Sequence, residues 1–228
     1  MSSDRQAAVA ASQLGPSSPV GSGRWRITGA TTVLLRNTTQ FVDKAGASAV
    51  AAAFGWEGDG VSATRPTPLP HVIEALRVEP ARAQISLKVT SDLVEGVRCR
   101  APIRQHALVV DEPATLGGTD EGPSPVELVL ASLGTCQAIT YQVWAAQLGI
   151  ALEDVRVEAE GDIDLRGFFG LDDDVRPGFG SIRLRVELNG PEDPARYEEL
   201  AEVVDRHCPV LDLVQNPVPV ERVVVASS

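Results

Sequence analysis

Two cysteines stand in surroundings that could support thiol chemistry. Cys136 lies at the centre of an apolar stretch, residues 117–149, which opens with a Gly/Pro loop. Cys208 directly precedes a proline in the stretch RHCPVLDLVQNPVPV. A thiolate is a nucleophile toward peroxides and a ligand for soft metals. These two thiols are therefore the first candidates for a reactive site.

The helical pattern around Cys136 allows two interpretations. On a helix this cysteine shares its face with Val129, Ser132, Thr140 and Val143. It could be a small buried hydrophobe, since free cysteine is among the most buried residue types. It could also be a reactive thiol, with Ser132 and Thr140 making its surroundings polar enough to tolerate a thiolate.

The other two cysteines have different surroundings. Cys208 ends a predicted helix, and Pro209 could begin a new one at its first position. The unpaired amides at such an N-terminus would favour the thiolate of Cys208 and lower its pKa; the alternative is a loop cysteine without a role. Cys99 lies on the apolar face of a predicted strand, which predicts a place in the core.

A metal site or a bound cofactor has little support in the sequence. Cys136, Cys208 and His207 could converge on a metal, but no CxxC or HxxxH spacing accompanies them. His207 follows Leu200 by one heptad on the apolar side of its helix, which favours a packed histidine. No nucleotide-binding or hydrolase motif is present. We therefore expect neither a metal nor a cofactor.

A long helix must position Cys136. The pattern predicts it from Ser124 to Gly149, whose missing Cβ suits a left-handed cap. Residues 128–152 carry no charge and are long enough to span a bilayer. However, three glutamines interrupt this stretch and its flanks are acidic, so we predict the buried central helix of a globular fold.

The remaining pattern predicts an α+β fold. Two strands at 81–95 and 97–109 turn near Glu95–Gly96, and Arg98, Arg100, Arg104 and His106 share one face of the second strand. Two antiparallel strands with alternating apolar residues follow the long helix, at 153–167 (with Leu165 facing inward) and at 178–190. The other predicted elements are a helix at 71–80 stopped by Pro80, a helix at 191–208 and a strand at 217–225.

Composition limits the partners and the compartment. The 228 residues carry a net charge of −11, which disfavours nucleic acid. Three cysteines are too few for a disulfide scaffold, which favours a reducing compartment, the cytoplasm. Residues 1–65 read as an N-terminal extension, loose over 1–23, with a possible strand at 24–37 and helix at 43–60. Residues 66–228 form the main domain.

Three motifs together resemble one known family. DEPATLGGTDEGPSPVELVLASLGTC, RPGFGSIRLRVEL and HCPVLDLVQNPVPV occur in the order found in the OsmC/Ohr family, and the resemblance covers residues 81–225. It implies an intertwined homodimer in which curved antiparallel sheets wrap two long central helices. It also implies that Cys136 is the peroxidatic and Cys208 the resolving cysteine of a peroxidase. The implied partners are an organic hydroperoxide and a dithiol reductant, which is of the lipoyl type in several members of the family.

The chain departs from the family pattern at the residues that assist the cysteine. In peroxidase members a glutamate follows the motif's proline, but here Val126 follows Pro125 and Glu127 comes one residue late. Glu127 is either a catalytic partner or an acid of the first helical turn. We favour Arg104, rather than Arg98 or Arg100, as the assisting guanidinium. The alternative function is a dimer without efficient peroxidase activity that acts in stress or binds a hydrophobic ligand.

Overall fold

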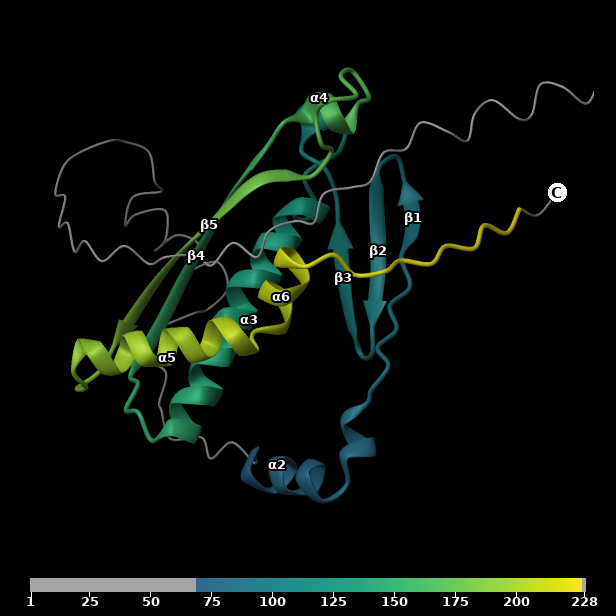
Figure 1. The fold of residues 1–228 in the computed structure, drawn as a ribbon. Coiled ribbons are helices and arrows are strands. Elements are labelled where there is room, and N and C mark those ends of the chain that lie inside the picture. The colour runs from purple at the N-terminus through teal and green to yellow at the C-terminus, as the bar shows by residue number, and fades with distance from the viewer. Residues whose placement is uncertain (1–68, 227–228) are drawn as a thin grey trace, which may run out of the picture. The chain divides into compact units, whose positions relative to one another are not determined.

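The fold is given by a computed structural model that describes residues 69–226. The predictions for residues 1–65 lie outside this part of the chain. The described residues combine helices with antiparallel strands, which confirms the α+β class (Figure 1). The elements are α2 (Leu69–Val78), η1 (Pro80–Ala83), β1 (Asp92–Glu95), β2 (Arg98–Ile103), β3 (His106–Val110), η2 (Ala114–Leu116), α3 (Pro125–Leu148), β4 (Asp154–Ile163), α4 (Leu165–Phe168), β5 (Phe179–Asn189), α5 (Pro194–His207) and α6 (Pro209–Gln215).

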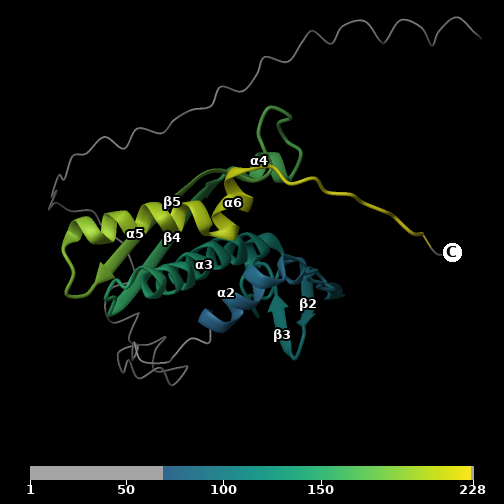
Figure 2. The same ribbon diagram turned by 60° about the horizontal axis from the view of Figure 1, so that its bottom comes forward.

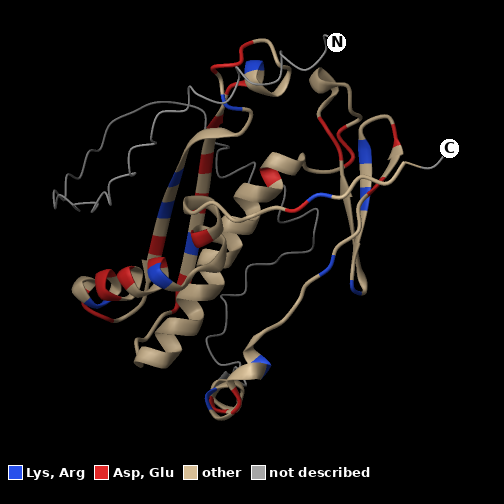
Figure 3. Cartoon of the chain, turned by 45° about the vertical axis from the view of Figure 1, so that its right-hand side comes forward, with Lys and Arg blue, Asp and Glu red and all other residues tan. Residues whose placement is uncertain are grey.

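The long helix α3 begins and ends as predicted. Ser124 is its N-cap, and its hydroxyl accepts from the amide of Glu127. The Glu127 carboxylate accepts in return from the Ser124 amide at 2.7 Å. Gly149 ends the helix with φ 64, in the left-handed region that favours glycine. Apart from Glu127 at its start, α3 carries no charged side chain, and Figure 3 shows the helix free of Lys, Arg, Asp and Glu over the rest of its length.

The first sheet differs from its prediction. The turn near Gly96 is present, but the continuous strand expected at 97–109 is wrong, because β2 and β3 form a hairpin with Arg104 and Gln105 as its loop. Arg104 adopts φ 55, as tight hairpin loops require at this position. The turn reverses the alternation of faces after it, so Leu108 and Val110, rather than Ala107 and Val109, share the face of Cys99 and Ala101.

The second sheet supports the helical layer. β4 and β5 pair antiparallel along their full length, as predicted, from Asp154 opposite Asn189 to Ile163 opposite Phe179. α3 contacts β4, and α5 and α6 lie alongside α3 (Figures 1 and 2). The main core therefore forms between α3, α5 and the sheet. Its buried residues are Tyr141, Ala145, Ile150, Leu152, Leu200 and Val204.

Three further predictions are wrong. The strand predicted at 81–95 is confined to β1, after η1 and a stretch without regular structure. Residues 217–226 form no strand, although their valines suit one; Val220, Val223 and Val225 are exposed and pair with no strand in the described chain. Leu165 does not face inward, because the ladder shifts at Asp162/Ile163 and the chain enters α4. None of the helices within residues 69–226 has the length and apolar content to cross a bilayer.

Candidate active site

The fold brings Cys136 and Cys208 together from distant parts of the sequence. Cys136 lies in the middle of α3, and Cys208 lies between α5 and α6. Cys208 forms a buried cluster with Leu133 and Leu211, and Cys136 packs against this cluster. Both cysteines have free thiols. Two thiols in contact at the junction of three helices form a dithiol that could cycle through a disulfide.

The two thiols differ in their access to solvent. Cys136 is half-buried, whereas Cys208 is 1% exposed. Burial raises the pKa of the Cys208 thiol, and the neighbouring Cys136 adds to the rise. The pKa reduction predicted for Cys208 is therefore wrong, because desolvation outweighs the amides of Val210 and Leu211. Its position was predicted correctly, since Cys208 is the N-cap of α6 and Pro209 is the first helical residue.

The neighbours of the cysteines are held by the helices themselves. Thr140 donates its hydroxyl to the Cys136 carbonyl at 2.7 Å, so this hydroxyl serves the helix backbone rather than a thiolate. His207 stacks against Trp144 with ring centroids 4.2 Å apart. This contact joins the end of α5 to α3, immediately before Cys208. His207 is exposed but packs as predicted, and within residues 69–226 no cluster suited to a metal forms.

Glu127 and Arg104, the residues predicted to assist the thiol, lie at the start of α3 and in the loop of the β2–β3 hairpin. Glu127 lies nine positions before Cys136, and its carboxylate is engaged in the capping box with Ser124, which lowers its pKa. Arg104 is exposed at the tip of the β2–β3 hairpin. Arg98 forms ion pairs with Glu95 and Glu121. The carboxylate of Glu127 and the guanidinium of Arg98 are therefore engaged by partners other than the two cysteines.

Sequence reasoning missed the residue that organises the loop leading into α3. Asp111 is 1% exposed. Its carboxylate accepts from the Thr119 hydroxyl at 2.7 Å and from the amides of Glu112, Thr119 and Glu121. A Cβ at Gly118 would lie 1.7 Å from the Glu112 carbonyl oxygen, so the loop needs glycine there. An aspartate at the start of a Gly-rich loop was the available signal.

These hydrogen bonds make the loop sensitive to acid. They lower the pKa of Asp111 from 3.8 to about 2, with the Thr119 hydroxyl as the largest cause. The ionised Asp111 carboxylate therefore contributes its full stabilisation of the folded state above pH 4. This contribution is lost as the pH falls from about 4 toward 2 and the carboxylate is protonated. We expect Asp111→Asn to melt at a lower temperature than the wild type at pH 7. The difference should shrink at pH 3, and thermal melts at both values measure it.

A matched control separates this effect from general acid denaturation. Asp173 is exposed, and Asp173→Asn should melt like the wild type at both pH values. A constant difference between wild type and Asp111→Asn from pH 7 to pH 3 would contradict the assignment of the effect to this carboxylate.

A cavity of about 580 Å³ adjoins the thiol cluster. It lies between α3, β5, α5 and α6, and it shares Leu133, Leu211, Ile182 and Leu184 with the cluster. Its volume is typical of small-molecule sites, and its wall combines apolar side chains with polar ones such as Ser181, Arg176 and Gln215. Leu133 and Leu211 therefore contact the thiols and also line a cavity that is large enough for a small ligand.

Comparisons with known proteins identify a similar sequence family and a similar fold. The sequence model of a family described as OsmC-like protein matches residues 118–222. The uncharacterized protein YmaD of Bacillus subtilis (strain 168) is 26% identical over 111 residues, which are 48% of this chain and 71% of YmaD. An OsmC like protein from Mycoplasma pneumoniae aligns with a TM-score of 0.52 and 20% identity, over 59% of this chain and 90% of that one. An organic hydroperoxide resistance protein from Legionella pneumophila aligns with a TM-score of 0.46 and 18% identity, over 58% and 92%.

Proposed function

We propose that this chain, whose residues 118–222 match the OsmC-like family, is a thiol-dependent peroxidase that reduces organic hydroperoxides through Cys136 and Cys208. The observation that carries the proposal is the packing of Cys136 against the buried cluster of Cys208. Their motifs lie far apart in the sequence, and only the junction of α3, α5 and α6 brings them together. A disulfide cycle needs this proximity.

The difference in burial supports a division of roles between the two cysteines. The thiolate of Cys136, the more exposed of the two, attacks the outer oxygen of ROOH. The O–O bond breaks, the sulfur becomes a sulfenic acid, and RO⁻ takes a proton and leaves as ROH. The Cys208 thiol, whose pKa is raised by burial, then attacks the sulfenic sulfur. Its proton passes to the departing oxygen during the attack, and water leaves as the disulfide forms.

An external dithiol closes the cycle. One of its thiolates attacks the disulfide, and its second thiol completes the exchange, so the dithiol is oxidised and both cysteines return to thiols. Such a reductant favours a reducing compartment, and we propose the cytoplasm. The second attack is intramolecular for a dithiol but not for a monothiol.

The reductant provides the test of this proposal. With cumene hydroperoxide as substrate, we expect steady consumption with dihydrolipoamide. With glutathione at equal thiol concentration we expect a rate lower by about tenfold or more, because the second thiol must then come from solution. Hydroperoxide consumption can be followed by a ferrous oxidation assay. Failure of both reductants to support turnover, with the protein thiols still free, would refute the peroxidase.

We also propose that the active form is an intertwined homodimer. The β1–β3 sheet has no extended contact with α3, α5 or α6 within the described chain. Large apolar side chains stay exposed on it and on α3, including Leu93 at 68% and Ile139 at 63%. A second copy would cover these surfaces. Light scattering should give twice the 24.1 kDa of one chain; a mass of one chain would refute the dimer.

The hairpin tip is the place from which an arginine could assist. Arg104 is exposed and forms no ion pair within residues 69–226, whereas Arg98 is engaged by two glutamates. In a dimer the hairpin could reach a thiol of the second copy, and Arg104 stays our candidate for favouring the thiolate and orienting the peroxide. We propose that Glu127 acts indirectly, by fixing the start of α3.

A further inference from the structure

An aromatic contact joins the end of α5 to α3. The rings of His207 and Trp144 have centroids 4.2 Å apart and are tilted by 43°. Trp144 is half-buried and packs against the core between α3 and α5, whereas His207 is exposed. The His207 ring therefore fills no space in the core. Its contact with the indole links the surface end of α5 to the long helix.

A hydrogen bond holds the His207 ring in this orientation. Its Nδ1 lies 2.7 Å from the carbonyl oxygen of Val203, one turn earlier in α5. A carbonyl group only accepts, so Nδ1 carries the hydrogen of this bond. The ring is therefore tied to the backbone of α5, and the ring and the last turn of the helix move as one unit.

Cys208 follows this ring directly and has little freedom of its own. Its amide donates to the carbonyl of Val204 at 2.9 Å, and its carbonyl accepts from the amide of Asp212 at 3.0 Å. Cys208 is both the C-cap of α5 and the N-cap of α6. Because both of its backbone groups are engaged, its position depends on how the two helices are held against α3.

Two contacts with α3 hold the chain on either side of Cys208. The first is the aromatic contact at Trp144. The second is made by Leu211, three residues after Cys208, which lies in the buried cluster with Leu133. In α3, Leu133 comes before Cys136 and Trp144 comes after it. The chain between the two contacts therefore passes α3 in the region of Cys136, where the two thiols meet.

We propose that the contact between His207 and Trp144 is a clasp that positions Cys208 against Cys136, so that both aromatic residues are positioning residues for the formation of the disulfide. This role rests on the disulfide cycle proposed above and adds to it two residues without a thiol. A displacement of about 1 Å can slow such an intramolecular step by about a hundredfold. The clasp therefore sets the effective concentration of one thiol at the other, a quantity that can be measured without a hydroperoxide.

Glutathione redox buffers measure this effective concentration. The full-length chain carries Cys99→Ser, so that only Cys136 and Cys208 react. The protein thiols give two hydrogens to glutathione disulfide, which becomes two molecules of glutathione as the protein disulfide forms. The equilibrium constant of this exchange is the effective concentration. We expect His207→Ala and Trp144→Leu each to lower it by about tenfold, because the aromatic contact is lost.

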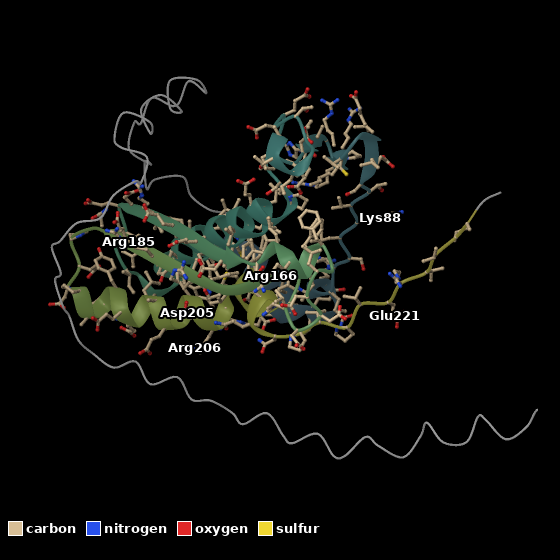
Figure 4. All side chains as sticks on the ribbon, turned by 90° about the horizontal axis from the view of Figure 1, so that it is seen from above. Lys88, Arg166, Arg185, Asp205, Arg206 and Glu221 are labelled. Carbon is tan, nitrogen blue, oxygen red and sulfur yellow. The ribbon has the colours of Figure 1, made fainter. Side chains whose placement is uncertain are left out.

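Three further variants show whether the contact itself is responsible. His207→Phe keeps a ring against Trp144 and should stay within about threefold of the wild type. The double variant of His207→Ala and Trp144→Leu should fall no further than the weaker single variant, because both changes remove the same contact. Arg206→Ala is the matched control and should have no effect. Arg206 is exposed in the same turn, and Figure 4 shows it on the side of α5 away from the β4–β5 ribbon.

A kinetic measurement separates positioning from a general loss of structure. With cumene hydroperoxide, His207→Ala should form the sulfenic acid of Cys136 at the rate of the wild type. It should then close the disulfide about tenfold more slowly, which dimedone reports by trapping more of the sulfenic acid. A general loss of structure would change both rates.

The outcomes for the clasp and for the peroxidase are distinct. An unchanged effective concentration in His207→Ala, an equal loss in Arg206→Ala or His207→Phe, or an additive loss in the double variant would overturn the clasp. Absence of sulfenic acid in every variant, with the effective concentrations in the expected order, would refute the peroxidase and support the clasp.

Discussion

Replacing Cys136 with serine should lower kcat/KM for cumene hydroperoxide by about 10³-fold or more, because a hydroxyl is not ionised at neutral pH and is a far weaker nucleophile. Cys208→Ser should behave differently. Its Cys136 should still be oxidised once, to a sulfenic acid, but the dithiol-dependent cycle should stall because no resolving thiol follows. Single-turnover and steady-state rates on the same samples distinguish the two variants.

Cys99 supplies the matched control for these substitutions. It lies in β2, opposite Val110, and has no contact with the cluster around Cys208 in the described chain. Cys99→Ser should keep both the single-turnover and the steady-state rate. A Cys136→Ser variant that reduces the hydroperoxide at the rate of the wild type would move the chemistry to another residue.

Leu200→Ala should lower the free energy of unfolding by about 2 to 5 kcal/mol, because a buried side chain is lost and the space it leaves cannot fully close. Leu200 is 0% exposed and lies in the core that joins α5 to α3 and to the β4–β5 sheet. That core holds Cys208 near Cys136, so the variant should also lose peroxidase activity at temperatures where the wild type keeps it.

Urea unfolding at one fixed protein concentration measures this effect, since a dimer's stability depends on concentration. Leu213→Ala is the control, because Leu213 is 56% exposed on α6. Its truncation should lower the free energy of unfolding by no more than about 0.5 kcal/mol per chain. Equal losses for the two variants would show that the α3–α5 core is not the main support of the site.

The sequence predicted α3 almost to the residue because its end signals are local. Ser124 and Glu127 form the capping box, and Gly149 adopts the left-handed conformation. The N-cap position of Cys208 was predictable for the same reason, from Pro209 after it. The β2–β3 loop could not be predicted, because Arg104 adopts a positive φ at a place where no glycine or asparagine marks a turn.

The parts that depend on distant contacts were less predictable. The predicted fall in the pKa of Cys208 rested on the helix N-terminus alone, whereas burial by residues from α3 decides its direction. Residues 217–225 have the composition of a strand but no partner strand in the described chain. The meeting of the two cysteines followed from the family resemblance and from no spacing in the sequence.

The most direct test of the peroxidase is the mass of the protein after one reaction. The fully reduced chain is treated with one equivalent of cumene hydroperoxide, and its intact mass and peptide map are recorded. The account predicts the loss of two hydrogens and a cross-link between the peptides of Cys136 and Cys208. Unchanged thiols with the hydroperoxide left intact, or a cross-link that requires Cys99, would contradict it.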